Sequence, residues 1–196
     1  MSATQPKSPP DPDSANMLCN LPRARAKMED ERLEAIVGAS FINSYYLSGV
    51  RTLFNEWCFS EPYEAAILPC DTTKAPTFVT LSAVLPALVG GMPTWMPNIR
   101  LYDWLRIDGT VEPVDVDANL NKAIAAFIDE RVSGETANDI VSAAVGALEQ
   151  LGLTQGRIGF DDLRFGGFVR ERLPGIEVVD AHTLFWDIRK VRTPRE

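Results

Sequence analysis

The sequence predicts an α/β domain with a mixed β-sheet of about five or six strands and helices on its faces. Two patterns indicate this class: a strand hairpin in the first half of the chain, and an alternation of helices and strands in the second half. The composition agrees, because 45% of the 196 residues are hydrophobic and 23% are charged. A chain of this length and apolar content can bury a sizeable core in one domain.

The first half of the chain contains the hairpin. Residues 64–70 and 76–80 are apolar runs on either side of a polar turn, and this arrangement predicts two antiparallel strands. The other elements predicted here are a surface helix over 21–33, a strand over 35–39, a loop and short strand over 42–49 that Gly49 ends, a short helix capped by Ser82 and running to Leu88, and a strand over 99–104.

The second half contains the strongest helical pattern, over residues 136–151, with Gly152 placed to end it. Its apolar face is expected to pack on the sheet through Ile140, Val141, Ala144, Val145 and Leu148. The remaining predicted elements are helices over 119–131, 163–172 and 181–190, and strands over 157–160 and 176–179.

The charge of the chain excludes one class of partner. The net charge of −8 argues against nucleic acid, because phosphate binding needs a basic patch. Residues 103–139 carry nine acidic and three basic side chains, so this segment holds −6 of the net charge. We interpret it as a solvated outer layer of the domain.

The rest of the composition is typical of a cytoplasmic protein without a membrane partner. Residues 1–20 are predicted to form a disordered tail, because they are rich in proline and polar residues. The most apolar window, 78–92, is interrupted by Pro86 and is too short for a membrane span, which needs about 20 apolar residues. The three cysteines show no metal-binding spacing, which fits a reducing cytosol.

The sequence contains no motif for a phosphate-binding loop, a dinucleotide site, a zinc protease or a serine hydrolase. His182 is the only histidine, and we interpret it as structural or exposed because no catalytic partners can be named for it. Asp161 and Asp162 are interpreted as a helix cap and a first-turn acid. Cys58 is interpreted as a packed thiol, because no basic neighbour would lower its pKa.

Three blocks of sequence carry a resemblance to a known family. Residues 43–49, N-S-Y-Y-L-S-G, are similar to the N-x-x-Y-L-T/S-G signature of the N-terminal domain in the creatinase, prolidase and aminopeptidase P family. Residues 148–160 resemble its helix-to-strand passage. Residues 178–196 resemble its last strand, last helix and linker, with Arg192 in place of the usual lysine. The resemblance implies a domain over 21–190 and the start of a linker over 191–196.

The resemblance also implies which chemistry lies outside this chain. In the family, the metal ligands belong to a C-terminal catalytic domain, and this sequence ends where that domain is expected to begin. A divalent metal pair, such as manganese, cobalt or zinc, would belong to that domain, so no catalytic or metal-binding residue is expected here. The resemblance therefore implies a non-catalytic N-terminal domain of a metal-dependent Xaa-Pro peptidase or creatinase-like hydrolase.

In the family, this domain helps to form a homodimer and its loops help to close the partner's active site. The matching segment here is 50–62, in which Arg51 would pair with a substrate carboxylate and Trp57 would stack on a proline ring or methyl group. The plainer interpretation is that Arg51 is a surface charge and Trp57 a core aromatic. The alternative function is a stand-alone binding or dimerisation module without an enzymatic parent.

Overall fold

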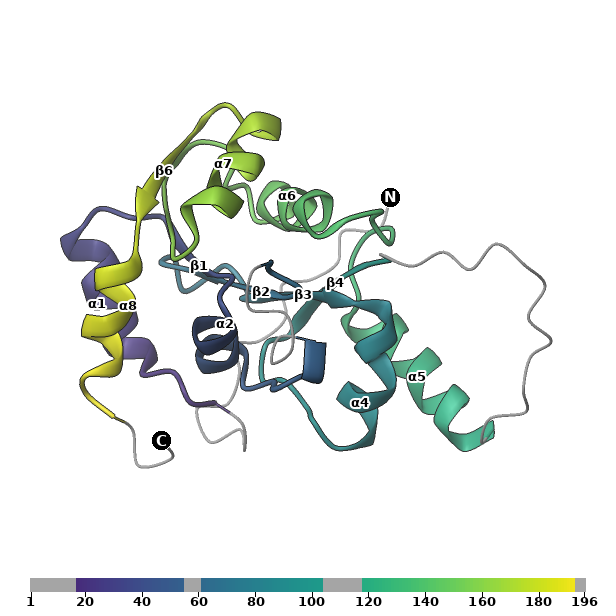
Figure 1. The fold of residues 1–196 in the computed structure, drawn as a ribbon. Coiled ribbons are helices and arrows are strands. Elements are labelled where there is room, and N and C mark those ends of the chain that lie inside the picture. The colour runs from purple at the N-terminus through teal and green to yellow at the C-terminus, as the bar shows by residue number, and fades with distance from the viewer. Residues whose placement is uncertain (1–16, 55–60, 104–117, 193–196) are drawn as a thin grey trace.

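The computed structural model describes residues 17–54, 61–103 and 118–192, and in these ranges it contains a six-stranded mixed sheet (Figure 1). The strand order is β4-β3-β2-β1-β5-β6, and only β2 runs antiparallel to its neighbours. The predicted fold class is therefore confirmed. The strands are β1 Ala35–Gly38, β2 Ala65–Pro69, β3 Thr77–Leu81, β4 Asn98–Tyr102, β5 Gly156–Phe160 and β6 Ile176–Asp180.

Helices cover both faces of the sheet (Figure 1). Helices α6 and α7 lie above it, α2 and α4 lie below it, and α1 and α8 lie side by side at the β6 end. The helices are α1 Leu21–Asp30, α2 Phe41–Ser48, α4 Leu85–Gly90, α5 Ala118–Arg131, α6 Ile140–Gln150, α7 Leu163–Arg172 and α8 His182–Arg189, with a 3-10 turn η1 Ser82–Val84 before α4.

The core lies on both faces of the central strands. Every residue of β1, β2 and β3 is buried, as expected for strands covered on both sides. Above the sheet, α6 buries Leu148 together with its small residues Ala143, Ala144 and Ala147. The predicted contacts Ile140, Val141 and Val145 are only half-buried, so the helix is rotated towards its alanines.

The main correction concerns residues 42–49, which were predicted as a loop and a short strand. They form α2 instead, and its first turn is capped by the Ser40 hydroxyl, which accepts a hydrogen bond from the backbone N–H of Asn43. Gly49 ends the helix with a φ of 75°, which favours glycine. A side chain on Gly38 would collide with the backbone of Asn43, so glycine there lets α2 approach β1.

Two helix starts also differ from the prediction. Helix α6 begins at Ile140 rather than at residue 136, because the Asp139 carboxylate accepts the backbone N–H of Ser142 and so caps it. Ser82 does not cap the helix that follows it; its hydroxyl donates to the Asp103 carboxylate. Here a contact with the end of β4 has replaced the expected local cap.

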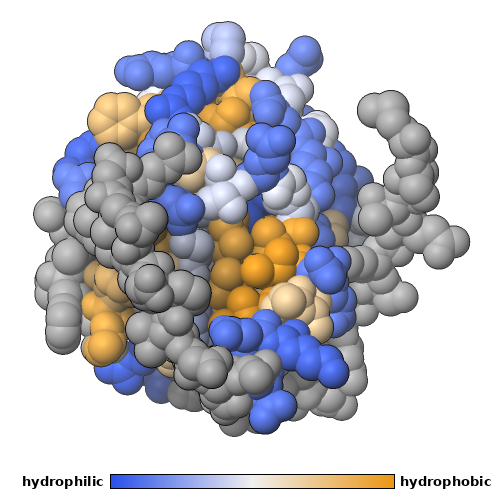
Figure 2. All heavy atoms as spheres, turned by 90° about the vertical axis from the view of Figure 1, so that its right-hand side faces the viewer, coloured by the Kyte–Doolittle hydropathy of each residue, from blue (hydrophilic) through white to orange (hydrophobic). Residues whose placement is uncertain are grey.

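Of the acidic segment 103–139, the structure describes Asp103 and the residues from 118 onwards. Its helix α5 has no fully buried side chain among those described, and its apolar residues Ile124 and Phe127 are only half-buried. Figure 2 shows hydrophobic side chains gathered in a patch on the side of the molecule where α5 and α6 lie. Asp129 and Glu135 are exposed, as expected for an outer layer, whereas Asp139 serves as a cap.

Several predictions concern the chain near the limits of the described ranges. Residues 17–20 were assigned to the tail, but Cys19 is buried and Asn20 caps α1 through the backbone N–H of Arg23, so these residues belong to the folded part. Trp57 and Cys58 lie outside the described residues, as does most of the predicted tail. No helix within the described ranges is long and apolar enough to cross a membrane.

Candidate functional site

The carboxyl ends of β1 and β5 form a crevice. These strands are parallel neighbours, but the chain leaves β1 for α2 below the sheet and leaves β5 for α7 above it (Figure 1). Ligands of open α/β sheets bind where neighbouring connections diverge in this way. A cavity of about 340 Å³ opens at this point, and we call it the switch-point crevice. Its walls include Ser40, Asn43, Asp161, His182 and Arg189.

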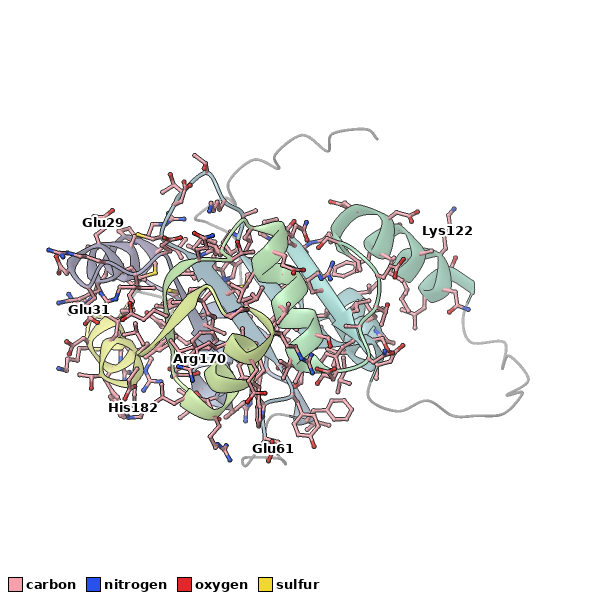
Figure 3. The ribbon with its side chains drawn as sticks, turned by 90° about the horizontal axis from the view of Figure 1, so that it is seen from above. Glu29, Glu31, Glu61, Lys122, Arg170 and His182 are labelled. Atoms are coloured by element: carbon pink, nitrogen blue, oxygen red, sulfur yellow. The ribbon has the colours of Figure 1, made fainter. Side chains whose placement is uncertain are left out.

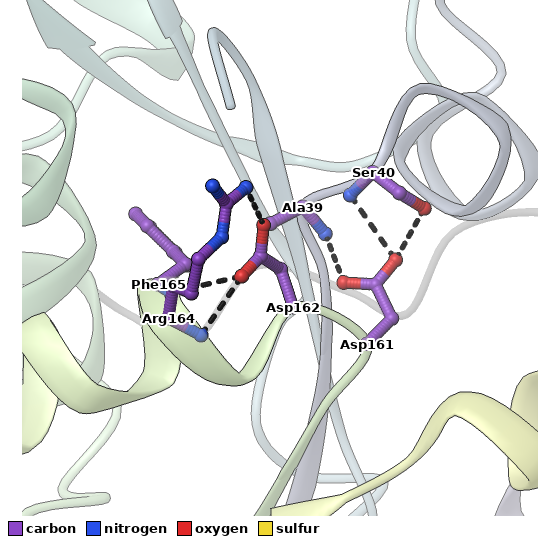
Figure 4. A network of polar contacts seen from close by, with 6 residues as sticks. All are labelled: Ala39, Ser40, Asp161, Asp162, Arg164 and Phe165. Carbon is purple, nitrogen blue, oxygen red and sulfur yellow. Dashed lines mark hydrogen bonds and ion pairs between the residues drawn. The ribbon is translucent and has the colours of Figure 1, made fainter. Parts of the chain in front are cut away.

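Asp161 holds the two sides of the crevice together (Figure 4). Its Oδ1 accepts the backbone N–H of Ala39 at 2.8 Å, and its Oδ2 accepts the backbone N–H and the hydroxyl of Ser40 at 3.1 and 2.5 Å. Oδ2 also accepts the side-chain amide of Asn43 at 2.8 Å. The carboxylate thus lies at the N-terminal end of α2, where the helix dipole favours a negative charge.

Asp162 has the local role that was predicted for the pair. Its carboxylate accepts the backbone N–H groups of Arg164 and Phe165 and so caps α7 (Figure 4). Partial burial works against its ionisation, but the hydrogen bonds from Arg164 and Phe165 outweigh burial and hold the pKa of Asp162 below its ordinary value. Asp162 is therefore the cap of α7, and neither carboxylate is a first-turn acid of that helix, because Asp161 lies before the cap and its partners lie across the crevice.

The third wall of the crevice comes from α8. The Trp186 indole N–H donates to His182 Nε2 at 3.2 Å, and the Arg189 guanidinium lies 4.8 Å from the centre of the Trp186 ring. Arg189 Nη1 donates to the Asn43 side-chain oxygen at 2.9 Å. His182 is exposed and lies at the start of α8, as Figure 3 shows, which confirms its interpretation as an exposed residue.

Asn43 connects these groups. It is buried, and its amide uses the nitrogen towards Asp161 and the oxygen towards Arg189. The three sequence blocks behind the resemblance therefore meet in one place: Asn43 opens the first, Asp161 follows the second and Arg189 belongs to the third. These roles of Asn43 and Arg189 were not predicted from the sequence, although their positions in the first and last blocks were the available signal.

The substrate-binding residues predicted from the resemblance are not brought into this crevice. Arg51 follows the C-terminal end of α2, is exposed, and is not among the residues that line the cavity. Trp57 lies outside the described residues, so the pair stays a prediction. Among the residues that the structure describes, no three histidine, cysteine, aspartate or glutamate side chains gather as a metal site.

Replacing Asp161 with alanine should lower the free energy of unfolding by about 1–3 kcal/mol. The reason is that the buried N–H of Ala39 and the amide of Asn43 would lose a charged acceptor. Urea unfolding followed by circular dichroism measures this, with Glu171→Ala as the control because Glu171 is an exposed acid on α7. Equal stability of the two variants would show that the carboxylate does not hold the crevice together.

Comparison with solved structures identifies the fold. No protein-family model matches the chain, and no curated protein matches it by sequence. A prolidase from Thermococcus sibiricus matches with a TM-score of 0.53 at 12% identity, over 87% of this chain and 36% of the other. A dipeptidase from Pyrococcus horikoshii OT3 matches with a TM-score of 0.52 at 14% identity, over 89% of this chain and 37% of the other.

A proline dipeptidase from Streptococcus pneumoniae matches with a TM-score of 0.52 at 12% identity, over 89% of this chain and 99% of the other. This chain thus spans little more than a third of the first two proteins and nearly all of the third. At these identities the likeness establishes a shared fold. The resemblance to the creatinase, prolidase and aminopeptidase P N-terminal domain is therefore confirmed at the level of the fold.

Proposed function

We propose that this chain is a non-catalytic domain of a metal-dependent Xaa-Pro peptidase or related creatinase-like hydrolase, and that it serves dimerisation and closure of the substrate site. The observation that carries the proposal is the shared fold with a proline dipeptidase and a prolidase. The junction of Asn43, Asp161 and Arg189 supports it, because the three sequence blocks of the resemblance converge there.

The proposal places the divalent metal pair on a separate catalytic domain, either on the same polypeptide or on another. The crevice carboxylates do not fit a metal, because Asp161 accepts four hydrogen bonds and Asp162 caps α7 while pairing with Arg164. A metal-activated water needs a site with an open coordination position. This chain would instead supply part of the wall of the substrate site and contacts between the subunits of the dimer.

The purified chain alone should not hydrolyse an Xaa-Pro dipeptide. With alanyl-proline and added manganese, cobalt or zinc, product formation should equal that of buffer with the same metal, because the described residues gather no metal ligands. Product analysis by liquid chromatography measures this. Metal-dependent turnover that disappears in His182→Ala would contradict the non-catalytic assignment.

An antibody raised against this domain tests its assignment to a peptidase. The material that it precipitates from an extract of the source cells should hydrolyse alanyl-proline with added manganese, and a chelator should abolish this activity. A non-immune antibody is the control. A precipitate that contains the domain but no such activity would favour the stand-alone binding or dimerisation module.

Sedimentation of the purified chain separately tests dimerisation, for which a species of twice the chain mass is expected.

Arg51 provides the test of substrate-site closure. In the active peptidase that contains this domain together with its catalytic domain, Arg51→Ala should lower kcat/KM for alanyl-proline by about tenfold or more. The reason is that a bidentate contact to the substrate carboxylate would be lost. Arg170→Ala is the control, since Arg170 is an exposed arginine on α7. Unchanged KM and kcat in Arg51→Ala would remove this residue from the site, and Trp57→Ala would then test the remaining candidate.

A further inference from the structure

A second hollow lies beside the switch-point crevice, between α2 and the C-terminal end of α8. It encloses about 600 Å³ and shares Ile42, Trp186 and Arg189 with the crevice. Its walls also include Tyr45 of α2 and the cations Lys190 and Arg192. We call this hollow, with these six residues, the basic groove.

The charge of the basic groove is opposite to that of the chain. Three cations line it, and no carboxylate is among its described lining residues, although the whole chain carries −8. Lys190 is bound to Asp187 at 2.5 Å, whereas Arg189 contacts the neutral groups Asn43 and Trp186. Because Asp187 offsets one cation, the groove keeps a local positive excess. Charge complementarity therefore favours a negatively charged occupant.

The groove also presents apolar anchors on two helices, α2 and α8. Ile42 is 56% exposed and Trp186 is 54% exposed, and they come from different helices. The hydrogen bond from Trp186 to His182 and the Arg189 guanidinium against its ring fix the orientation of the indole. Tyr45 stacks on Phe41 with ring centres 6.4 Å apart. Ordered aromatic groups beside arginines are typical of residues that dominate binding energy at interfaces.

We propose that the basic groove binds an acidic peptide segment that carries an aromatic or aliphatic side chain. The apolar side chain would lie against Ile42 and Trp186, and the peptide carboxylates would face Arg189 and Arg192, whose guanidinium groups suit two-point contacts with carboxylates. This inference does not depend on the proposed peptidase role, because it rests on the charge and exposure of the groove.

The experiment uses three fluorescein-labelled twelve-residue peptides and the purified full chain. One peptide combines glutamate with leucine and phenylalanine, the second replaces glutamate with lysine, and the third combines glutamate with serine. Fluorescence anisotropy should give at least tenfold tighter binding for the first peptide than for either of the others. Raising the salt concentration from 50 to 500 mM should weaken this binding, because exposed charges are screened.

Matched variants test whether the first peptide binds at the basic groove. Lys190→Glu combined with Arg192→Glu should weaken binding of the first peptide at least tenfold. Lys122→Glu combined with Arg170→Glu makes the same charge change on α5 and α7, at two residues that do not line the groove, and should leave binding within twofold. Trp186→Ala should also weaken binding tenfold, whereas Phe168→Ala removes an aromatic side chain on α7 that is 53% exposed and should not.

Four results would overturn the proposal. Equal binding of the acidic and basic peptides would show that the charge of the groove does not determine binding. Full binding by the Lys190 and Arg192 double variant would show the same. Salt-sensitive self-association that the same double variant abolishes, without peptide binding, would assign the groove to a second copy of this chain. Binding to phosphatidylserine vesicles but to none of the peptides would assign it to a lipid surface. Circular dichroism and the urea midpoint confirm that each variant is folded.

Discussion

Replacing Leu148 with alanine should lower the free energy of unfolding by about 2–5 kcal/mol. Leu148 is 0% exposed and lies on the face of α6 that packs on β3 and β4. Its neighbours on the helix are the small residues Ala144 and Ala147, so the surrounding structure has few atoms that can move into the cavity. The loss should therefore lie towards the upper end of the range.

Urea unfolding measures this loss, and Leu163→Ala is the matched control. Leu163 is the first residue of α7 and is 50% exposed, so the same truncation there should cost less than about 1 kcal/mol. A loss below about half a kcal/mol in Leu148→Ala would place that side chain at the surface and contradict the packing of α6 on the sheet.

Raising the pH from about 4.5 to about 7 should remove about 3 kcal/mol of stability through Glu64 alone. Glu64 is 0% exposed and immediately precedes β2, and its Oε1 accepts the Thr80 hydroxyl at 3.2 Å. Burial raises the pKa of Glu64 from 4.5 to about 7, although hydrogen bonds from Thr52 and Thr80 act in the opposite direction.

The direction of this pH effect on stability depends on whether the folded or the unfolded state keeps the proton on Glu64. Between pH 4.5 and 7 the folded protein retains a proton on Glu64 that the unfolded chain has released, so the stability falls as the pH rises. Below pH 4.5 both states are protonated and the contribution is complete. Above pH 7 both are ionised, and the folded state contains a buried charge.

Glu64→Gln isolates this effect, because glutamine keeps the shape and does not ionise. Relative to the wild type, this variant should gain about 3 kcal/mol between pH 4.5 and pH 8, measured by urea unfolding at a series of pH values. The exposed Glu171→Gln serves as the control and should stay parallel to the wild type. A constant difference between Glu64→Gln and the wild type would show that Glu64 ionises at the same pH in both states.

Local sequence patterns predicted most of the fold. The hairpin of β2 and β3 and the helix α7 could be predicted because each depends on periodicity and on nearby turn or cap residues. The failure at residues 42–49 has a physical reason. Ile42, Tyr45 and Tyr46 favour strands by propensity, but packing of α2 against β1 and β2 outweighs that preference.

The candidate site was less accessible to sequence reasoning. Its central contacts join residues far apart in the chain: Asp161 is 118 residues from Asn43, and Arg189 is 146 residues from Asn43. A hydrophobic period reports which face of an element is buried, but it does not report which polar side chains meet across the sheet. For the same reason, the sequence placed Asp161 with its neighbour Asp162 rather than with α2.

The pairing of α1 with α8 has a mechanical consequence. Arg23 donates through Nε and Nη2 to the backbone oxygen of Asp187, at 3.0 and 2.9 Å, and the Asn20 amide donates to the Val191 oxygen at 3.5 Å. The first and last described segments thus leave the fold at one corner. A force that pulls on both segments would break the contacts between α1 and α8 one after another before it acted on the strands of the sheet. Joining the two segments by a short linker would instead give a circular chain. This circular chain could be opened at an exposed turn to give new termini.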